Sequence, residues 1–590
     1  MRFAKFLSCA LVFTLLFSLI CFSAEAAVAT TPTMVNVDGI TYRISADGTA
    51  EITKCNFNKS GEVEIPVVVH DAIVTSIGDY SFQYCEEIAS VIIPSSVTHI
   101  GYSAFYGCKK LESVSIPDSV EKIEYAAFAK CNSLKNAKIA DLAAWCAAKL
   151  DGPYANPAHI TGKLDFGISM ENFVIPSYIG TIGAYTFYGC TDIKSVEISD
   201  GISSIGECAF YGCQNLTEVK VPNSVLKIEY GAFSDCDKLS VVGVSAENAY
   251  YKNLDGALVE LDTQTLIRGY NNTVVPDDGS ITIIGAYAFS GCDNITSITI
   301  PDCITYIGSS AFKNCSKLSK ITLSKGIDCI SPAAFSGCEQ LSDIVIPENV
   351  TRICSNAFRY CNSITEIKLH DKITEIGNFA FADCKALTGL SVPSSIQKMG
   401  EGVVSGSTAV TSLTVEPGSY YYSADNCIIR EGSVIAGCKA SRIPVDGSIT
   451  MIGNYAFAGQ TDLTQVAITK SVENIGISAF NGCTALQKVY YGSDESDWNG
   501  IKLSSENEPL LNAEKLYNNT DMPATSYQGQ QNQADSSDSS GNGIDLWLIL
   551  VIVGAIIIVT AAITIVVIKL KKPVATKTAD ESADENKPEE

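Results

Sequence analysis

Apolar and polar positions recur along most of the chain with a period of 23 residues, as from Phe82 to Phe105 and on to Phe128. The stretch SVIIPSSVTHIGYSAFYGCKKLE at 90–112 is followed at once by SVSIPDSVEKIEYAAFAKCNSLK, and the two align without a gap. Such a period is typical of a solenoid, because one unit cannot bury its apolar face alone and must stack on its neighbours. The repeated phenylalanine occupies Phe82, Phe105, Phe128, Phe187, Phe210, Phe233, Phe289, Phe312, Phe335, Phe358, Phe381, Phe457 and Phe480, with Val404 in its place in one diverged copy.

Each unit is expected to add one short strand to a parallel β-sheet. In LESVSIP the apolar residues Leu111, Val114 and Ile116 have the spacing of a strand, and the proline suits the strand's end because it lacks a backbone donor. The stretch that follows, up to Phe128, has the spacing of a turn or short helix rather than of a second long strand. The predicted coil therefore has a sheet on one face and short turns, 3-10 or helical segments on the other.

The pattern C-x-x-L-x-x-V-x-I-P-x-x-V-x-x-I-G-x-x-A-F resembles the BspA-type leucine-rich repeat of microbial surface proteins, over about residues 60–490. The resemblance implies a right-handed, curved repeat solenoid displayed at a cell surface, with adhesion to host or matrix proteins as the activity of some members. Three positions depart from the pattern: Gln460 replaces the cysteine, and Glu124 and Cys354 stand where glycine is usual.

The two ends of the chain predict secretion and membrane anchoring. Residues 1–27 read as a signal peptide, because Arg2 and Lys5 precede an apolar run that ends in small residues. Residues 546–568 are uncharged and long enough to span a bilayer, and the lysines after Ile568 place the tail in the cytoplasm and the repeats outside. The expected plan is a signal peptide at 1–27, an N-terminal β cap at 28–65 with a hairpin at 39–55, the solenoid at 66–490, a C-terminal cap at 491–518, a disordered stalk at 519–543, one transmembrane helix at 544–568 and a cytoplasmic tail at 569–590.

Three insertions interrupt the repeats, at about 135–175, 241–280 and 413–448. In the first, Asp141 is expected to cap a short helix whose Trp145 and Cys146 pack on the solenoid. The other two resemble each other, and each predicts a β-hairpin spliced between coils. Their tyrosine pairs are either ligand contacts or packing residues: Tyr250, Tyr251, Tyr421 and Tyr422.

Twelve of the 22 cysteines lie three residues after the repeated phenylalanine. Stacked coils would align them in one column of buried, reduced thiols, although disulfides are the alternative in a secreted protein. The column comprises Cys85, Cys108, Cys131, Cys190, Cys213, Cys236, Cys292, Cys315, Cys338, Cys361, Cys384 and Cys483. A separate pair, Cys427 and Cys438, would face each other across a hairpin if Gly432 and Ser433 form its turn.

Charge and motif content exclude several classes of function. A net charge of -24, from 65 acidic against 41 basic residues, excludes the basic footprint of a nucleic-acid-binding protein. The four histidines, His70, His99, His159 and His370, are scattered, and no hydrolase or P-loop motif is present. We therefore expect no enzyme, no metal site and no cofactor.

The outward position of each strand predicts where a ligand binds. Apolar residues of L-x-x-V-x-I face the core, so the residue between the last two faces out, and stacking aligns these residues in one row. The row comprises Ile92, Ser115, Glu197, Lys220, Thr299, Thr322, Val345, Lys368, Ser391 and Tyr490. We expect Thr299, Thr322, Val345 and Lys368 to contact a protein or glycan ligand as part of an adhesin-type, single-pass surface protein; a receptor or a structural spacer is the alternative.

Overall fold

The computed structural model describes residues 32–523. The predicted signal peptide, the transmembrane helix, the tail and all but the start of the predicted stalk lie outside these residues. Within residues 32–523 no helix is both long enough and apolar enough to cross a membrane.

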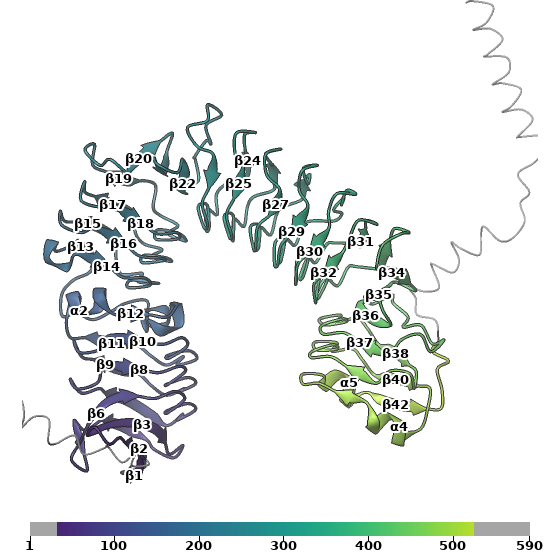
Figure 1. Cartoon of the computed structure of the whole chain (residues 1–590), viewed down its shortest axis with the longest axis horizontal. Coiled ribbons are helices and arrows are strands. Elements are labelled where there is room, and N and C mark those ends of the chain that lie inside the picture. Colours follow the sequence, from purple (N-terminus) through teal and green to yellow (C-terminus); the bar gives the residue numbers. More distant parts are fainter. Residues whose placement is uncertain (1–31, 524–590) are drawn as a thin grey trace, which may run out of the picture. The chain divides into compact units, whose positions relative to one another are not determined.

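Two ladders of parallel strands run along the stacked coils (Figure 1). The long-strand ladder has the predicted strands and a register of one repeat, so that Val91 pairs with Val114 and Val114 with Ala137. Its strands are β4 (Gly61–Glu64), β7 (Ile88–Ile92), β9 (Ser113–Ile116), β11 (Asn136–Ile139), β13 (Asn172–Ile175), β15 (Ser195–Ile198), β17 (Glu218–Val221), β19 (Val242–Val244), β24 (Ser297–Thr299), β26 (Lys320–Thr322), β28 (Asp343–Ile344), β31 (Gly389–Val392), β33 (Ser412–Val415), β38 (Gln465–Ile468), β40 (Lys488–Tyr491) and β42 (Glu514–Tyr517).

The short-strand ladder was not predicted: apart from its first member, its strands are two residues long. They pair in the same register, as Ile205 with Ile228, and each buries one apolar side chain, except that β27 buries both of its residues and Leu503 of β41 is only half-buried. Its strands are β6 (Ala72–Ile77), β8 (His99–Ile100), β10 (Lys122–Ile123), β12 (Lys149–Leu150), β14 (Thr181–Ile182), β16 (Ser204–Ile205), β18 (Lys227–Ile228), β23 (Ile283–Ile284), β25 (Tyr306–Ile307), β27 (Cys329–Ile330), β29 (Arg352–Ile353), β30 (Glu375–Ile376), β32 (Lys398–Met399), β37 (Met451–Ile452), β39 (Asn474–Ile475) and β41 (Lys502–Leu503).

The remaining elements cap the coils or interrupt them. At the N-terminus the predicted hairpin is present as β2 and β3, which pair antiparallel and are joined by β1. The cap and insertion strands are β1 (Thr33–Val37), β2 (Ile40–Ile44), β3 (Thr49–Cys55), β5 (Val68–Val69), β20 (Tyr251–Leu254), β21 (Ala257–Glu260), β22 (Thr265–Arg268), β34 (Tyr422–Ala424), β35 (Cys427–Arg430) and β36 (Ser433–Ala436). The helices are α2 (Leu142–Ala147), η1 (Pro153–Ala155), α3 (Ala158–Thr161), η2 (Ser177–Ile179), α4 (Glu495–Gly500) and α5 (Glu508–Asn512).

The repeated phenylalanines form the centre of the core. Consecutive rings stack with centroids 4.9 to 5.7 Å apart and planes within 20° of parallel. In the same turns the N–H of eleven of the thirteen repeated phenylalanines donates to a backbone carbonyl of the next coil, as Phe312 N–H to Ala334 at 2.8 Å, whereas Phe480 N–H donates to Asn507 Oδ1 at 2.9 Å. In the Ala-Phe pair of the repeat, the alanine carbonyl accepts a hydrogen bond from the preceding coil, and the phenylalanine supplies the stacked ring.

The glycine of the Ile-Gly pair lies where two coils approach closely. A Cβ atom at Gly377 would lie 2.4 Å from the backbone nitrogen of Ser355, and one at Gly308 would lie 2.4 Å from that of Ala286. These distances are far shorter than van der Waals contact, so a side chain there would push the coils apart.

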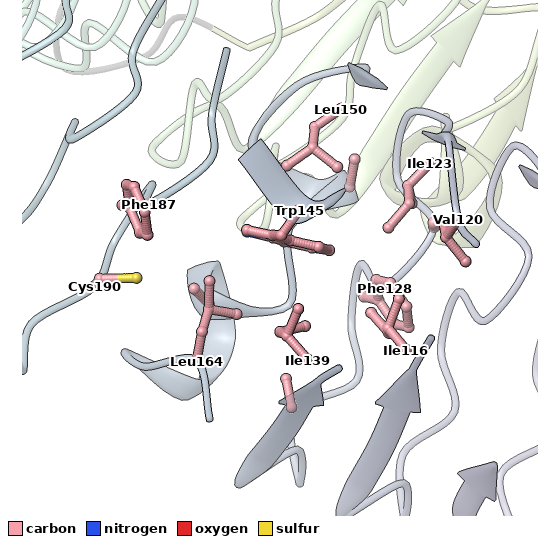
Figure 2. Close-up of a cluster of buried hydrophobic side chains, with 14 of the residues drawn as sticks. Ile116, Val120, Ile123, Phe128, Ile139, Trp145, Leu150, Leu164, Phe187 and Cys190 are labelled. Carbon is pink, nitrogen blue, oxygen red and sulfur yellow. The ribbon is translucent and has the colours of Figure 1, made fainter. Parts of the chain in front are cut away.

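Trp145 fills the break that the first insertion makes in the phenylalanine stack. As predicted, Asp141 caps α2, its carboxylate accepting from the Ala144 N–H at 2.8 Å. The cap presents the buried Trp145 ring between Phe128 and Phe187 (Figure 2). The indole Nε1–H donates to the Thr186 carbonyl at 2.9 Å, so the insertion is hydrogen-bonded to the coil that follows it.

The twelve column cysteines are all buried and free. In nine coils the thiol lies 3.0 to 3.3 Å from the carbonyl oxygen of the preceding coil's phenylalanine, to which it donates. In the diverged copy Ser407 donates to the Phe381 carbonyl at 2.8 Å. Gln460, by contrast, is buried with neither amide atom hydrogen-bonded.

The column thiols are expected to resist alkylation in the native protein. Burial raises the pKa of Cys292, Cys384 and Cys483 to about 12, so at neutral pH they are protonated and poor nucleophiles. Iodoacetamide followed by mass spectrometry should label the less buried Cys303 and Cys354 first. The column should be labelled only after denaturation without reductant; column thiols that stay unlabelled even then would be disulfide-bonded.

The turn predicted at Gly432 and Ser433 is wrong. Arg430 pairs with Ser433, so Glu431 and Gly432 form the turn, both with positive φ (50° and 74°), as a type I′ turn requires. A bulge between Ile428 and Ile429 shifts the register again, and Ile428 lies opposite Ala436. The count that placed Cys427 opposite Cys438 therefore fails, and both thiols are buried and free.

Candidate ligand-binding face

The outward row lies where the sequence placed it except at Tyr490, where the prediction is wrong: that ring is buried in a cluster with Ala467 and Met522. Thr299 and Thr322 are cross-strand partners on β24 and β26, and both are exposed. Val345 follows β28 with 76% of its surface exposed, and Lys368, one coil further, is also exposed. An apolar side chain this exposed, in the middle of a row of polar ones, is a contact available to a partner.

Three hollows lie along this part of the long-strand ladder, which we call the strand-face groove. The first, of 1110 Å³, is bounded by Thr299 and Thr322 and by the segment 273–278 that follows the first inserted hairpin. The second, of 460 Å³, contains Val345 and shares Thr322, Leu323 and Lys325 with the first. The third, of 310 Å³, contains Lys368 and residues of β31 and β33.

The ladder is interrupted at the groove. Each coil was expected to add a strand, but β28 ends at Ile344, the segment 366–369 is not in a strand, and the ladder resumes at β31. Ile346 and Ile367 are nevertheless buried, and the short strands β29 and β30 still pair. Buried side chains and the short-strand ladder keep this coil stacked on its neighbours. The coil can therefore lack a long strand, which leaves a gap in the long-strand ladder at this point.

Charged groups line the first two hollows. Lys325 Nζ lies 3.3 Å from Asp302, and Lys320 Nζ lies 2.6 Å from Asp343. The Lys325 backbone N–H donates to Asp302 at 3.0 Å and lowers the pKa of that carboxyl. Hydrogen bonds from the Ser280 hydroxyl and backbone N–H lower the pKa of Asp278 in the same way. Both carboxylates are ionised at neutral pH, on surfaces where ion pairs contribute little to stability.

The hairpin tyrosines divide into two roles. Tyr251 and Tyr421 are buried, so as ligand contacts they are wrong. Their hydroxyls accept the backbone N–H of Ile228 at 2.8 Å and of Met399 at 2.9 Å, which caps strands β18 and β32. Tyr250 and Tyr422, their chain neighbours, are 38% and 45% exposed and accessible to a ligand.

Two features of the surface escaped the sequence reading. Val274, 71% exposed, and the aspartates after it line the first hollow, and only the apolar pair Val274-Val275 beside Pro276 signalled them. A run of tyrosines on the turns was signalled by the recurring GYSAF, EYAAF and GAYTF. Among residues 32–523 no three His, Cys, Asp or Glu side chains gather closely enough to hold a metal ion.

Three bacterial proteins of solved structure have coils similar to those of this chain. A leucine rich cell surface protein from Faecalibacterium prausnitzii is 24% identical, with a TM-score of 0.39, covering 81% of this chain and 100% of its own. A leucine-rich repeat protein from Bacteroides ovatus is 23% identical, with a TM-score of 0.32, covering 82% and 99%. The pneumococcal vaccine antigen PcpA is 18% identical, with a TM-score of 0.32, covering 83% and 99%.

No curated protein matches the chain. The profile of the BspA type leucine rich repeat region, by contrast, matches in six copies, over residues 50–143, 166–253, 282–411 and 423–499. These segments make up more than half of the chain and contain the stacked phenylalanines, the cysteine column and most of the strand-face groove, whose segment 273–278 lies between two of them. The chain therefore belongs to the BspA type leucine rich repeat family.

Proposed function

We propose that this protein is displayed at the cell surface and binds an extracellular protein partner in the strand-face groove. The observation that supports the proposal is the groove itself, whose lining combines exposed Val274 and Val345 with ionised Asp278 and two lysine–aspartate pairs. A protein surface offers both apolar and charged groups to such a lining, whereas a neutral glycan offers no charge to Lys320 or Lys325.

The expected affinity is low for one molecule and higher for a crowded surface. The lining has no deep aromatic pocket, which is the usual anchor of a strong interface. Many copies on one cell would bind together and gain avidity without new contacts. The proposal of surface display is supported by the two apolar segments interpreted above as a signal peptide and a transmembrane helix. The proposed role is binding without catalysis.

A triple substitution tests the groove. Thr299→Arg, Thr322→Arg and Lys368→Glu together add bulk and alter charge at the hollows, and we expect on the order of tenfold weaker binding to whichever of fibronectin, laminin and collagen the full chain binds. The control carries Ser115→Arg, Glu197→Arg and Lys220→Glu, in the same row but outside the groove, and should bind as before. Circular dichroism checks that both variants fold. Equal binding by the two variants would move the site off the groove, and failure of all three proteins to bind would count against a matrix partner.

Protease treatment tests the display. Trypsin added to intact cells should remove binding and spare a tag at the C-terminus. Loss of the tag with binding retained would reverse the proposed orientation.

A further inference from the structure

Four tyrosines lie side by side at the N-terminal end of the solenoid, away from the strand-face groove: three on the turns of the first coils and the fourth on η1 of the first insertion. Tyr80, Tyr102, Tyr125 and Tyr154 are 51%, 37%, 46% and 39% exposed. Successive ring centroids lie 5.4, 5.9 and 6.2 Å apart, so each ring contacts the next. We call these four residues the tyrosine strip.

The strip continues into a more buried aromatic run that holds its end in place. The Tyr154 ring packs edge-on against His159 at 4.6 Å, and His159 lies 5.6 Å from Tyr188. Tyr188 stacks on Tyr211 at 5.0 Å, and the Tyr211 hydroxyl donates to the Asp235 carboxylate. Burial lowers the pKa of His159, so this part of the run is an uncharged aromatic support at neutral pH.

The exposed rings are positioned before any ligand arrives. Tyr80 has a positive φ of 57°, which a tyrosine adopts only when its surroundings impose it. The Tyr125 ring lies close to Gly152, where an added Cβ would be 3.4 Å away. A ring held in this way loses little conformational freedom on binding, which lowers the entropic cost of an interface.

Balanced polar groups flank the strip. Next to Tyr125, Glu124 lies 2.6 Å from Lys122 Nζ and 3.4 Å from His99, and Lys122 lies 3.4 Å from Asp151. Each lysine here is paired with a carboxylate. The flank therefore offers hydrogen-bond donors and acceptors, and its electrostatic potential is neither strongly positive nor strongly negative.

We propose that the tyrosine strip binds a linear, uncharged polysaccharide of β-1,4-linked pyranose units, with about one sugar per coil. A pyranose ring presents C–H groups on its faces, which suit aromatic rings, and hydroxyls on its edge, which suit the phenols and the flanking ion pairs. The spacing of the rings is set by the stacking of the coils, and an extended β-1,4-linked chain advances by nearly the same distance per sugar. A polyanion is disfavoured by the net charge of -24.

The strip differs from the groove in place and in chemistry. It lies at the N-terminal end of the solenoid, is aromatic, and flanks its rings with mutually paired charges, whereas the groove is aliphatic and charged. The two sites can therefore fail independently, because substitutions in one leave the other intact.

Calorimetry on the full chain with defined hexasaccharides tests the proposal. We expect binding of at least one of cellohexaose, mannohexaose and chitohexaose, and weaker or no binding of maltohexaose, whose α-links curve the chain. The variant Tyr102→Ala, Tyr125→Ala should bind on the order of tenfold more weakly, because two stacking surfaces are removed. Tyr102→Phe, Tyr125→Phe keeps the rings and should retain most of the binding, and Tyr360→Ala, an equally exposed tyrosine outside the strip, should change nothing.

Nitration of the wild-type chain gives a second readout that needs no variant. A saturating β-linked hexasaccharide should protect Tyr80, Tyr102 and Tyr125 from tetranitromethane and leave Tyr360 reactive. The proposal is overturned if no β-linked hexasaccharide binds, if the alanine variant folds and binds as before, or if protection is uniform. Preference for a proline-rich peptide over all sugars would overturn it in favour of a protein ligand.

Discussion

The substitution Phe335→Ala is expected to lower the free energy of unfolding by about 3–5 kcal/mol. Phe335 is fully buried and lies in the stack between Phe312 and Phe358, at 5.5 Å from each ring. Alanine would leave a cavity in the centre of one coil and remove a stacking partner from both neighbours. The loss therefore exceeds what the transfer of one side chain to water would give.

The damage should be local, because each coil contacts only its neighbours. Hydrogen exchange should rise most at the rungs from Phe312 to Ala334 and from Phe335 to Ala357, while the first coils keep their protection. Tyr360→Ala is the matched control, since it removes an exposed ring nearby. A loss below about 1 kcal/mol for Phe335→Ala would mean that the stack is not what stabilises the coils.

Trp145→Ala is the second large effect, and about 3–5 kcal/mol is expected again. The indole ring fills the space between Phe128 and Phe187, and its N–H reaches the Thr186 carbonyl. Without it the first insertion loses its largest side-chain contact with the next coil and one hydrogen bond, while the Asn156 amide still donates to the Tyr185 carbonyl at 2.7 Å. Hydrogen exchange should therefore increase across 141–190 first, and urea unfolding should show a transition at lower concentration.

Trp145→Phe separates packing from hydrogen bonding. The smaller ring keeps most of the contact but cannot donate to Thr186, whose carbonyl still accepts from the Asn156 side chain at 3.0 Å. The expected cost is about 1 kcal/mol. A cost for phenylalanine as large as that for alanine would show that the hydrogen bond, and not the ring, carries the stability.

The repeat architecture was predictable because the same residues make the same contacts in successive copies. One strand register, one stacked ring and one thiol column follow from the alignment of two copies, and Val91, Phe105 and Cys108 take the places expected of them. The short strands were missed because two residues, such as Ser204 and Ile205, are too few to show a period of their own.

What could not be predicted depends on features that occur once. The turn between β35 and β36 was predicted one residue too late because Glu431 adopts a positive φ. The register then shifts at a bulge opposite Ile428 and Ile429, and the residue pattern indicates neither feature. The roles of Tyr250 and Tyr251 are opposite although the residues are adjacent, since only one hydroxyl reaches the Ile228 N–H. Most of the outward row was predictable from alternation, but the hollows along it lie beside breaks in the ladder, the first at the segment 273–278 and the other two on either side of the interval between β28 and β31.

The one-coil register bears on how the gene can change. Because every rung joins a residue to its equivalent in the next copy, as in Ser297 with Lys320 and Lys320 with Asp343, a unit removed or duplicated as a whole leaves each remaining rung with an equivalent partner. Unequal recombination between neighbouring copies would therefore lengthen or shorten the protein by whole coils and keep the register between them. A gain or loss of one or two residues inside a unit would instead misalign the ring, the thiol and both strands of that coil at once.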